Sequence, residues 1–310
     1  MKRITRTSRR HLTCALAVLF GVATLASAST SYQGSFHRDL PVSGTADLEV
    51  LTRSGDITIH SGPAGSVSIQ GRIHVNDRWR NGDMESQIHE LEQNPPIRQT
   101  GNSIHIENVN VRDLSIDYEI TVPADTSVRT QSGSGDQTIE GLHSNLNLES
   151  GSGDMRLHDV NGDIHAHTGS GNVEARDVTG SFNAEAGSGD IRLEAKLAED
   201  VHAHTGSGNI EARGVQGGLH AEAGSGDITV DGVPSAAWEV RTGSGNVHLR
   251  VPEETGFNLE ASTGSGELIL HHPVTIQGNI GSSRHSISGP VHGGGPVLMV
   301  RTGSGDVEID

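Results

Sequence analysis

The sequence predicts an all-β chain: a parallel β-solenoid (β-helix) with rungs of roughly 18–19 residues and one short helix in an N-terminal insertion. Three observations support this fold class. A short glycine-rich phrase recurs at a nearly fixed spacing, apolar and polar residues alternate on both sides of it, and outward charges change sign from copy to copy. Self-similarity at such a period is typical of repeat proteins, in which each copy packs on its neighbours.

The recurring phrase is Gly-Ser-Gly followed by Asp, Asn or, once, Glu. Its first glycines are Gly133, Gly151, Gly169, Gly187, Gly206, Gly224, Gly243, Gly264 and Gly303. Successive copies are 18 or 19 residues apart up to Gly243, then 21 residues apart, and the last interval of 39 residues is about two steps. We expect these glycines to be structural turns, because glycine adopts positive φ without steric strain.

Around each phrase, apolar and polar residues alternate as they do in strands with one buried face. The apolar positions lie five and three residues before the first glycine, and four and six residues after it. In the copy around Gly187 they are Phe182, Ala184, Ile191 and Leu193. These four columns predict the core of a narrow coil, which agrees with an aromatic content of only 3%.

Outward positions change charge from one copy to the next. Two residues before the glycine, successive copies carry Glu149, His167, Glu185, His204 and Glu222, and further columns alternate arginine with glutamate. In a parallel stack equivalent residues lie side by side, where like charges repel and opposite charges attract. The alternation therefore favours stacked rungs over the rival fold, an antiparallel meander with a hairpin at each phrase.

The N-terminal residues 1–28 predict a secretory signal peptide. Basic residues precede an apolar run from Leu12 to Leu25, and the small residues that follow place the cleavage after Ala28. The pair Arg9-Arg10 leaves the twin-arginine route open beside the general secretory route. We therefore expect an exported protein, located in the periplasm or extracellularly at the cell surface.

Composition narrows the partners of the mature chain. Without residues 1–28 it has 17 Lys and Arg against 39 Asp and Glu, and no cysteine. Such an acidic surface repels nucleic acid, so no nucleic-acid partner is expected. No later apolar run is long enough to span a membrane. The acidic excess leaves divalent cations as possible ligands.

The mature chain divides into two predicted parts. Residues 29–125 form N-terminal strands, a short helix and the cap of the solenoid, and residues 126–310 form the repeat solenoid. The helix is indicated by Met84, Ile88 and Leu91 at helical spacing, and the two prolines after it end it. We expect this helix to cover the open first edge of the stack, since the terminal units of solenoids are usually atypical.

Three segments carry a resemblance to a known family. They are Tyr118-Glu119-Ile120-Thr121-Val122-Pro123, then Val128-Arg129-Thr130, then the serial Gly-Ser-Gly-Asp turns with an apolar pair after each. In these segments the chain resembles a bacterial family of unknown function known as putative adhesins, and the resemblance covers most of residues 45–310. It implies an exported β-helical protein, and it implies no particular activity.

A transition-metal site is the first candidate chemistry. His165 and His167 recur as His202 and His204, with Glu185 on the rung between them. A His-x-His pair on a strand places both imidazoles on one face, and imidazole binds zinc, copper or nickel. The alternative interpretation, which we favour, is a charge ladder in which histidine is the cationic partner of glutamate.

Calcium is the second candidate. The Gly-Asp turns resemble those of nonapeptide calcium-binding solenoids, which carry a Gly-Gly-x-Gly-x-Asp phrase on both sides of each coil. Here the opposite turn, such as Val160-Asn161-Gly162-Asp163, lacks that phrase, and half of the Asp positions are Asn. Hard cations need several carboxylates or carbonyls each. A built-in calcium site is therefore not expected, and no cofactor is predicted.

The third class is a polysaccharide-active β-helix enzyme. Such enzymes need clustered carboxylates that interrupt the repeat, whereas here the acids are spread in regular columns. We therefore expect no enzyme and no catalytic residues. The sequence favours an exported non-enzymatic structural or binding (adhesin-like) β-solenoid of the cell envelope, with an unknown envelope or surface partner. The alternative is a calcium- or transition-metal-binding exported protein.

Overall fold

A computed structural model describes residues 32–75, 82–273 and 285–310. These residues belong to one compact unit, Tyr32–Asp310. The predicted signal peptide and its cleavage point lie outside the described residues. The described part is almost entirely β structure, with one α-helix, so the prediction of an all-β chain with one short helix is confirmed.

The helix is α1 (Gly82–Gln93). The strands are β1 (Tyr32–Pro41), β2 (Asp47–Ser54), β3 (Ile57–Gly62), β4 (Ser66–Val75), β5 (Ile97–Thr100), β6 (Ser103–Ile106), β7 (Leu114–Pro123), β8 (Ser127–Ser134), β9 (Gln137–Glu140), β10 (Leu146–Ser150), β11 (Met155–His158), β12 (Ile164–Thr168), β13 (Val173–Ala186), β14 (Ile191–Ser207), β15 (Ile210–Ser225), β16 (Ile228–Gly232), β17 (Trp238–Ser244), β18 (Val247–Arg250), β19 (Phe257–Ser265), β20 (Leu268–Leu270), β21 (Ser286–Val291), β22 (Val297–Ser304) and β23 (Val307–Ile309).

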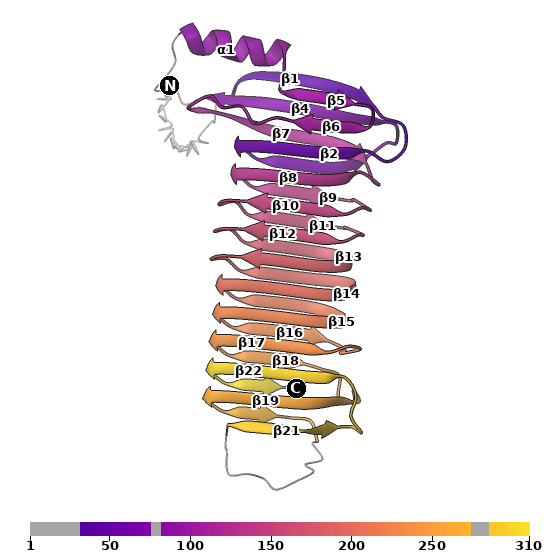
Figure 1. The fold of residues 1–310 in the computed structure, drawn as a ribbon, viewed down its shortest axis with the longest axis vertical. Coiled ribbons are helices and arrows are strands. Elements are labelled where there is room, and N and C mark those ends of the chain that lie inside the picture. Colours follow the sequence, from indigo (N-terminus) through magenta and orange to yellow (C-terminus); the bar gives the residue numbers. More distant parts are fainter. Residues whose placement is uncertain (1–31, 76–81, 274–284) are drawn as a thin grey trace, which may run out of the picture. The chain divides into compact units, whose positions relative to one another are not determined.

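Each copy of the repeat contributes a strand before the glycine phrase and a strand after it, and each strand pairs with its equivalents in the neighbouring copies. Strand β10 pairs in parallel with β12, so that Leu146 lies beside Ile164. Strand β11 pairs in parallel with β13, so that Met155 lies beside Val173. These registers exclude, for these copies, an antiparallel hairpin at the phrase. The result is a β-solenoid-like repeat (Figure 1).

The four apolar columns form the core of the repeat. Phe182, Ala184, Ile191 and Leu193 are each at most 1% exposed, because side chains on a strand alternate between the two faces. Leu268 and Leu270 are only partly buried, at the far end of the stack.

Two polar residues, Thr130 and Gln137, occupy core columns around Gly133. Gln137 stands four residues after Gly133 and is fully buried. Its side-chain amide donates to the carbonyl oxygen of Glu149 at 2.8 Å, and its side-chain carbonyl accepts from the hydroxyl of Thr130. Both hydrogen-bonding ends are therefore satisfied, which a buried amide requires.

The first copy of the repeat lies earlier in the chain than the sequence indicated. Strands β2 and β3 pair in parallel with β8 and β9, with Leu48 beside Val128 and Ile57 beside Gln137. The turn between them, Arg53-Ser54-Gly55-Asp56, is thus a copy of the phrase that lacks the first glycine. Strand pairing accordingly crosses the boundary predicted between residues 125 and 126.

At the other end, stacking order departs from chain order. Strand β22 pairs in parallel with β17 on one side and with β19 on the other. Strand β23 likewise pairs with both β18 and β20. The last copy of the phrase, at Gly303, is therefore inserted between the copies at Gly243 and Gly264, as Figure 1 shows for β17, β22 and β19.

Antiparallel strands and the helix complete the two ends. Strand β1 pairs with β4, β4 with β7 and β5 with β6 at one end, and β19 pairs with β21 at the other, all antiparallel. Helix α1 contacts β1: Ile88 is buried, and the backbone N–H of Ser35 donates to Glu92 at 3.0 Å. Met84 and Leu91 pack against the core as partly buried residues. The predicted helix is confirmed at this place (Figure 1).

Within the described residues, no helix combines the length and the hydrophobicity that a membrane crossing requires.

Candidate functional site

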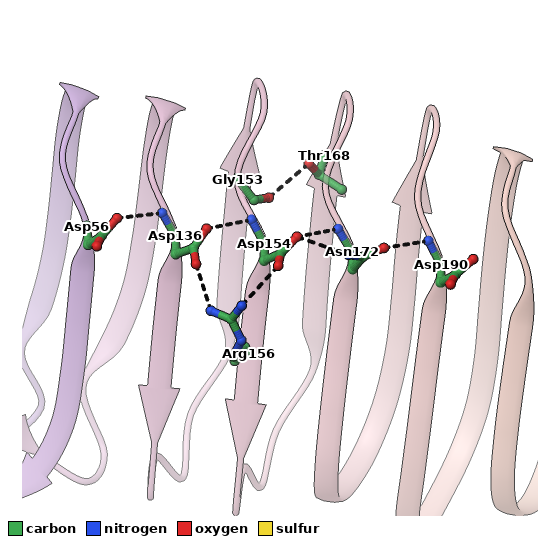
Figure 2. A network of polar contacts seen from close by, with 8 residues as sticks. All are labelled: Asp56, Asp136, Gly153, Asp154, Arg156, Thr168, Asn172 and Asp190. Carbon is green, nitrogen blue, oxygen red and sulfur yellow. Dashed lines mark hydrogen bonds and ion pairs between the residues drawn. The ribbon is translucent and has the colours of Figure 1, made fainter. Parts of the chain in front are cut away.

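The last residue of each phrase forms a ladder along the stack. Oδ1 of Asp136 accepts the backbone N–H of Asp154 at 3.1 Å, and Oδ1 of Asp154 accepts that of Asn172 at 2.9 Å. Oδ1 of Asn172 in turn accepts the N–H of Asp190 at 2.9 Å (Figure 2). The same bond then joins Asn209, Asp227, Asn246, Asp306 and Glu267 in this order. We call this row of residues the turn ladder.

The ladder explains why Asp and Asn alternate. Both offer the one oxygen that the backbone N–H needs, and an Asn between two Asp keeps like charges apart. The amide of Asn172 also donates to Asp154 at 3.2 Å. The turn oxygens thus accept backbone hydrogen bonds, which is a structural role for the positions weighed above as calcium ligands.

An arginine joins Asp136 and Asp154, two aspartates that adjoin in the turn ladder. Arg156 donates to Asp136 at 2.8 Å and to Asp154 at 2.9 Å (Figure 2). Partial burial tends to raise the pKa of Asp136. The hydrogen bonds from Arg156 and from the N–H of Asp154, with the arginine charge, outweigh burial and hold the pKa of Asp136 below its usual value.

The second glycine of the phrase has the expected positive φ in several copies, such as Gly135 and Gly226, but the first glycines are needed for a different reason. None of the nine first glycines has a positive φ. A Cβ on Gly151 would instead lie 2.5 Å from the carbonyl oxygen of Gly133, and a Cβ on Gly153 would lie 1.9 Å from that of Gly135. Each phrase therefore stacks its backbone directly on the phrase below. In Figure 2 the carbonyl of Gly153 also accepts from the hydroxyl of Thr168 at 3.2 Å.

The predicted histidine pairs lie on one face, across β12, β13 and β14. His165 and His202 flank Asn183, and His167 and His204 flank Glu185. Nδ1 of His167 lies 3.4 Å from Oε2 of Glu185. Nδ1 of His204 lies 3.9 Å from Oε2 of Glu222, which is its neighbour on β15. The strands therefore place these side chains side by side as the charge ladder requires.

The five predicted metal ligands are not gathered into one cluster of ligand atoms. They are His165, His167, Glu185, His202 and His204. A hollow of about 240 Å³ beside them is lined by Glu149, His165, His167 and Glu185 together with asparagines. In the described residues, three or more ligand atoms converge at a different place, described below.

The opposite face carries a row of ion pairs between arginine and glutamate. The pairs run through Glu174, Arg176, Glu194, Arg213, Glu211 and Arg192 in this order. Nε of Arg192 donates to Glu211 at 2.8 Å, and this hydrogen bond, with the charges of Arg192 and Arg213, outweighs partial burial and lowers the pKa of Glu211. A groove of about 610 Å³ beside this row is lined by acids and arginines together with asparagines and apolar residues.

A group of histidines and carboxylates lies where the last copy is inserted. Nε2 of His248 lies 2.8 Å from Oδ2 of Asp310, and Nδ1 of His271 makes a hydrogen bond with Oδ1 of Asp310. Nδ1 of His248 lies 3.9 Å from Glu308. The ligand atoms of His271, Glu308 and Asp310 all lie within 4.8 Å of one another. We call these four residues the His–carboxylate cluster.

The Asp310 carboxylate is the centre of this cluster. Hydrogen bonds from His248 and His271 hold its pKa below the usual value of an aspartate. The cluster brings two imidazoles and two carboxylates together, which is a ligand set that divalent metal ions accept.

Comparison with protein families identifies the family of this chain. The profile of the Toastrack DUF4097 family matches residues 39–212 and 163–310. The chain belongs to this family. The membership agrees with the β-solenoid-like repeat described above and with the expected resemblance to adhesin-like proteins of unknown function. A search of the curated proteins found no match.

Solved structures similar to this Toastrack chain include three bacterial proteins. A putative adhesin from Bacteroides fragilis has 16% identity and a TM-score of 0.44, covering 90% of this chain and 98% of its own. A putative cell adhesion protein from Clostridium sporogenes has 13% identity and a TM-score of 0.26, covering 89% and 98%. A putative lipid binding protein from Parabacteroides distasonis has 13% identity and a TM-score of 0.49, covering 89% and 97%.

Sequence reasoning on this Toastrack chain missed the His–carboxylate cluster, although the columns contain a signal for it. His271 and Asp310 both stand seven residues after their first glycine, and His248 and Glu308 both stand five residues after theirs. The signal appears only when the last copy is placed between the copies at Gly243 and Gly264. In chain order, His248 and Asp310 are two copies apart.

Proposed function

We propose that this protein is an exported, non-enzymatic structural or binding module of the cell envelope, adhesin-like and built as a continuous parallel β-solenoid of 18–19-residue rungs. The observation that carries the proposal is that the outward-facing charged side chains pair with one another. On both faces, ionisable side chains of neighbouring copies pair with one another, as Arg192 does with Glu211 and His167 with Glu185. These ion pairs hold neighbouring rungs in register, so the paired side chains have a structural role.

The carboxylates argue for binding or support and against catalysis. A glycosidase needs two carboxyl groups facing a substrate cleft, one of which is kept protonated. On the arginine–glutamate face, Glu174, Glu194 and Glu211 each pair with arginine. The hydrogen bond from Arg192 lowers the pKa of Glu211, which favours its ionised form. The groove beside them is lined by acids and arginines together with uncharged residues, and its Glu174, Glu211, Arg192 and Arg213 belong to the row of ion pairs. These features support a rigid surface for recognition.

The proposed location outside the cytoplasm rests on the N-terminal sequence. The proposed class of partner rests on the net negative charge of the chain. Residues 1–28 have the pattern of an export signal, and the chain after them is strongly acidic. An acidic, regular surface suits a partner with basic groups or bound cations in the envelope or on a surface outside it. Nucleic acid is disfavoured by the same charge.

Fractionation with envelope binding tests this proposal. The full chain, tagged after Asp310, is expressed in a Gram-negative host, and its N-terminus and location are determined by intact mass and by protease accessibility. We expect a product that begins at Ser29, lies outside the cytoplasm and co-sediments with isolated envelope fragments in a salt-dependent manner. A cytoplasmic, uncleaved product would contradict export. Release of reducing ends from envelope polysaccharide, lost in a Glu194→Gln variant, would contradict the non-enzymatic role.

A further inference from the structure

The His–carboxylate cluster joins three neighbouring copies of the repeat. His248 lies on β18, Glu308 lies on β23 with Asp310 directly after it, and His271 directly follows β20. Strand β23 lies between the other two strands. The four side chains meet only because the last copy of the repeat is inserted there.

The backbone around the cluster is held in place. The N–H of His271 donates to the carbonyl of Ile309 at 2.9 Å, and the N–H of Val251 donates to the carbonyl of Asp310 at 2.8 Å. The N–H of Asp310 donates to the carbonyl of Leu249 at 2.9 Å. These bonds fix the spacing of the three strands, so that only side-chain rotations are left to adjust.

The side chains match the requirements of a metal ion. Zinc binds histidine nitrogens and carboxylate oxygens at about 2.0–2.2 Å, so two of its ligand atoms lie at most about 4.4 Å apart. The ligand atoms of His271, Glu308 and Asp310 lie within 4.8 Å of one another, and His248 lies 2.8 Å from Asp310. All four side chains are partly exposed, from 28% for His248 to 58% for His271. Small rotations therefore suffice to exchange the His–Asp hydrogen bonds for metal bonds.

We propose that His248, His271, Glu308 and Asp310 form a binding site for a divalent transition-metal ion of the zinc class. Two imidazoles favour zinc, copper or nickel over calcium, which takes six to eight oxygen ligands. A bound ion would connect the inserted copy to the copies on both sides of it. Because the ligands come together only in the stacked state, the ion stabilises the insertion of the last copy.

The histidine pairs on β12 and β14 provide a matched control. His165 on β12 and His202 on β14 are exposed histidines of the repeat region, and each lies beside Asn183 in register. Replacing them removes two surface imidazoles and leaves the His–carboxylate cluster unchanged.

The test uses the full chain purified without a polyhistidine tag and stripped of metal. Zinc chloride is titrated into wild type, into His248→Gln/His271→Gln and into the control His165→Gln/His202→Gln. We expect one zinc ion per chain in wild type and in the control, a rise in their melting temperatures, and no comparable rise with calcium. We expect the affinity of the cluster variant to fall at least tenfold. Equal affinities in all three proteins, equal losses in both variants, or no stoichiometric binding by wild type would each overturn the proposal.

A second measurement does not depend on the variants folding. Histidine ring resonances of the wild-type chain are followed by NMR as zinc is added. We expect the first equivalent of zinc to shift the rings of His248 and His271 before those of His165 and His202. The reverse order, or a simultaneous shift of all four, would assign the binding to scattered surface histidines and overturn the proposal.

Discussion

The backbone N–H of Asp306 donates a hydrogen bond to Oδ1 of Asn246 at 2.9 Å, although 60 residues separate the two in the chain. The same bond joins Asp154 and Asn172, which are neighbouring copies 18 residues apart. The copy at Gly303 therefore stacks on the copy at Gly243 as if it were the next one in the chain. Glu267 then follows Asp306 in the ladder, through a bond of 2.8 Å.

The alternation of Asp and Asn in the turn ladder is expected to matter for stability. Asn172→Asp would place a third carboxylate between Asp154 and Asp190, while the oxygen that accepts the backbone N–H remains. Like charges at neighbouring positions of a sheet cost up to about 1 kcal/mol. We expect the free energy of unfolding, measured with urea at pH 7, to fall by about that amount.

The control for this variant is Asp190→Asn. It changes the charge by one unit in the opposite direction, keeps the acceptor for Asn209 and creates no like-charge neighbours. We expect its free energy of unfolding to stay within about 0.5 kcal/mol of wild type. If the two variants lost the same stability, charge alternation would not be the reason for the pattern.

The ion pair of Asp136 and Arg156 predicts a pH dependence. The pKa of Asp136 is lower in the folded protein than its usual value, so its contribution is fully present above that value and is lost as pH falls through the folded pKa. Asp136→Asn keeps the acceptor for Asp154 and removes the charge. Because the pair is partly exposed, we expect a loss of about 0.5–1 kcal/mol at pH 7.

The difference between this variant and wild type is expected to close when urea unfolding is repeated at acidic pH, as the pH falls through the lowered folded pKa of Asp136 and the aspartate becomes protonated. Added salt at pH 7 should also narrow it, since salt screens exposed charges. A difference that stayed constant from pH 7 to pH 2.5 would show that Asp136 acts through hydrogen-bond geometry alone.

The close backbone stacking of the phrases predicts a large cost for a single methyl group. In Gly153→Ala the new Cβ would lie 1.9 Å from the carbonyl oxygen of Gly135, which is backbone and cannot move aside alone. We expect a loss of more than about 3 kcal/mol, or failure to fold, measured by thermal denaturation. The neighbouring Ser152→Ala, at the exposed tip of the same turn, should change stability by less than about 0.5 kcal/mol. A mild effect of Gly153→Ala would contradict the stacking of Gly153 on Gly135.

The sequence predicts the rung well and the order of the rungs poorly. Burial follows from the alternation of residues such as Phe182 and Ala184, because the period of a strand is local. Every copy presents nearly the same apolar columns, however, so the columns do not specify which copy lies beside which. The copy around Gly55 was missed because its phrase begins with Arg53, and its neighbour follows 80 residues later.

The same distinction applies to the candidate sites. The histidine pairs lie on one face as expected, since His165 and His167 are two residues apart on one strand. The His–carboxylate cluster depends on the place of the last copy, and no local pattern around Asp310 indicates that place. The positive φ expected for the first glycines was wrong, and their close backbone contacts were missed, because close approach between two distant segments cannot be read from one of them.

Disulfide trapping tests the inserted last copy most directly. In a Cys14→Ser background, Arg241→Cys is combined either with Arg301→Cys or with Ser262→Cys, and the oxidised chains are analysed by peptide mass spectrometry. Residue 301 lies between the other two in register, so residues 241 and 262 are two strands, about 9.6 Å, apart. Neighbouring strands, about 4.8 Å apart, permit a disulfide, whereas Cα atoms more than about 7 Å apart do not. We predict a disulfide between positions 241 and 301 and none between 241 and 262; the opposite result would show that the copies stack in chain order.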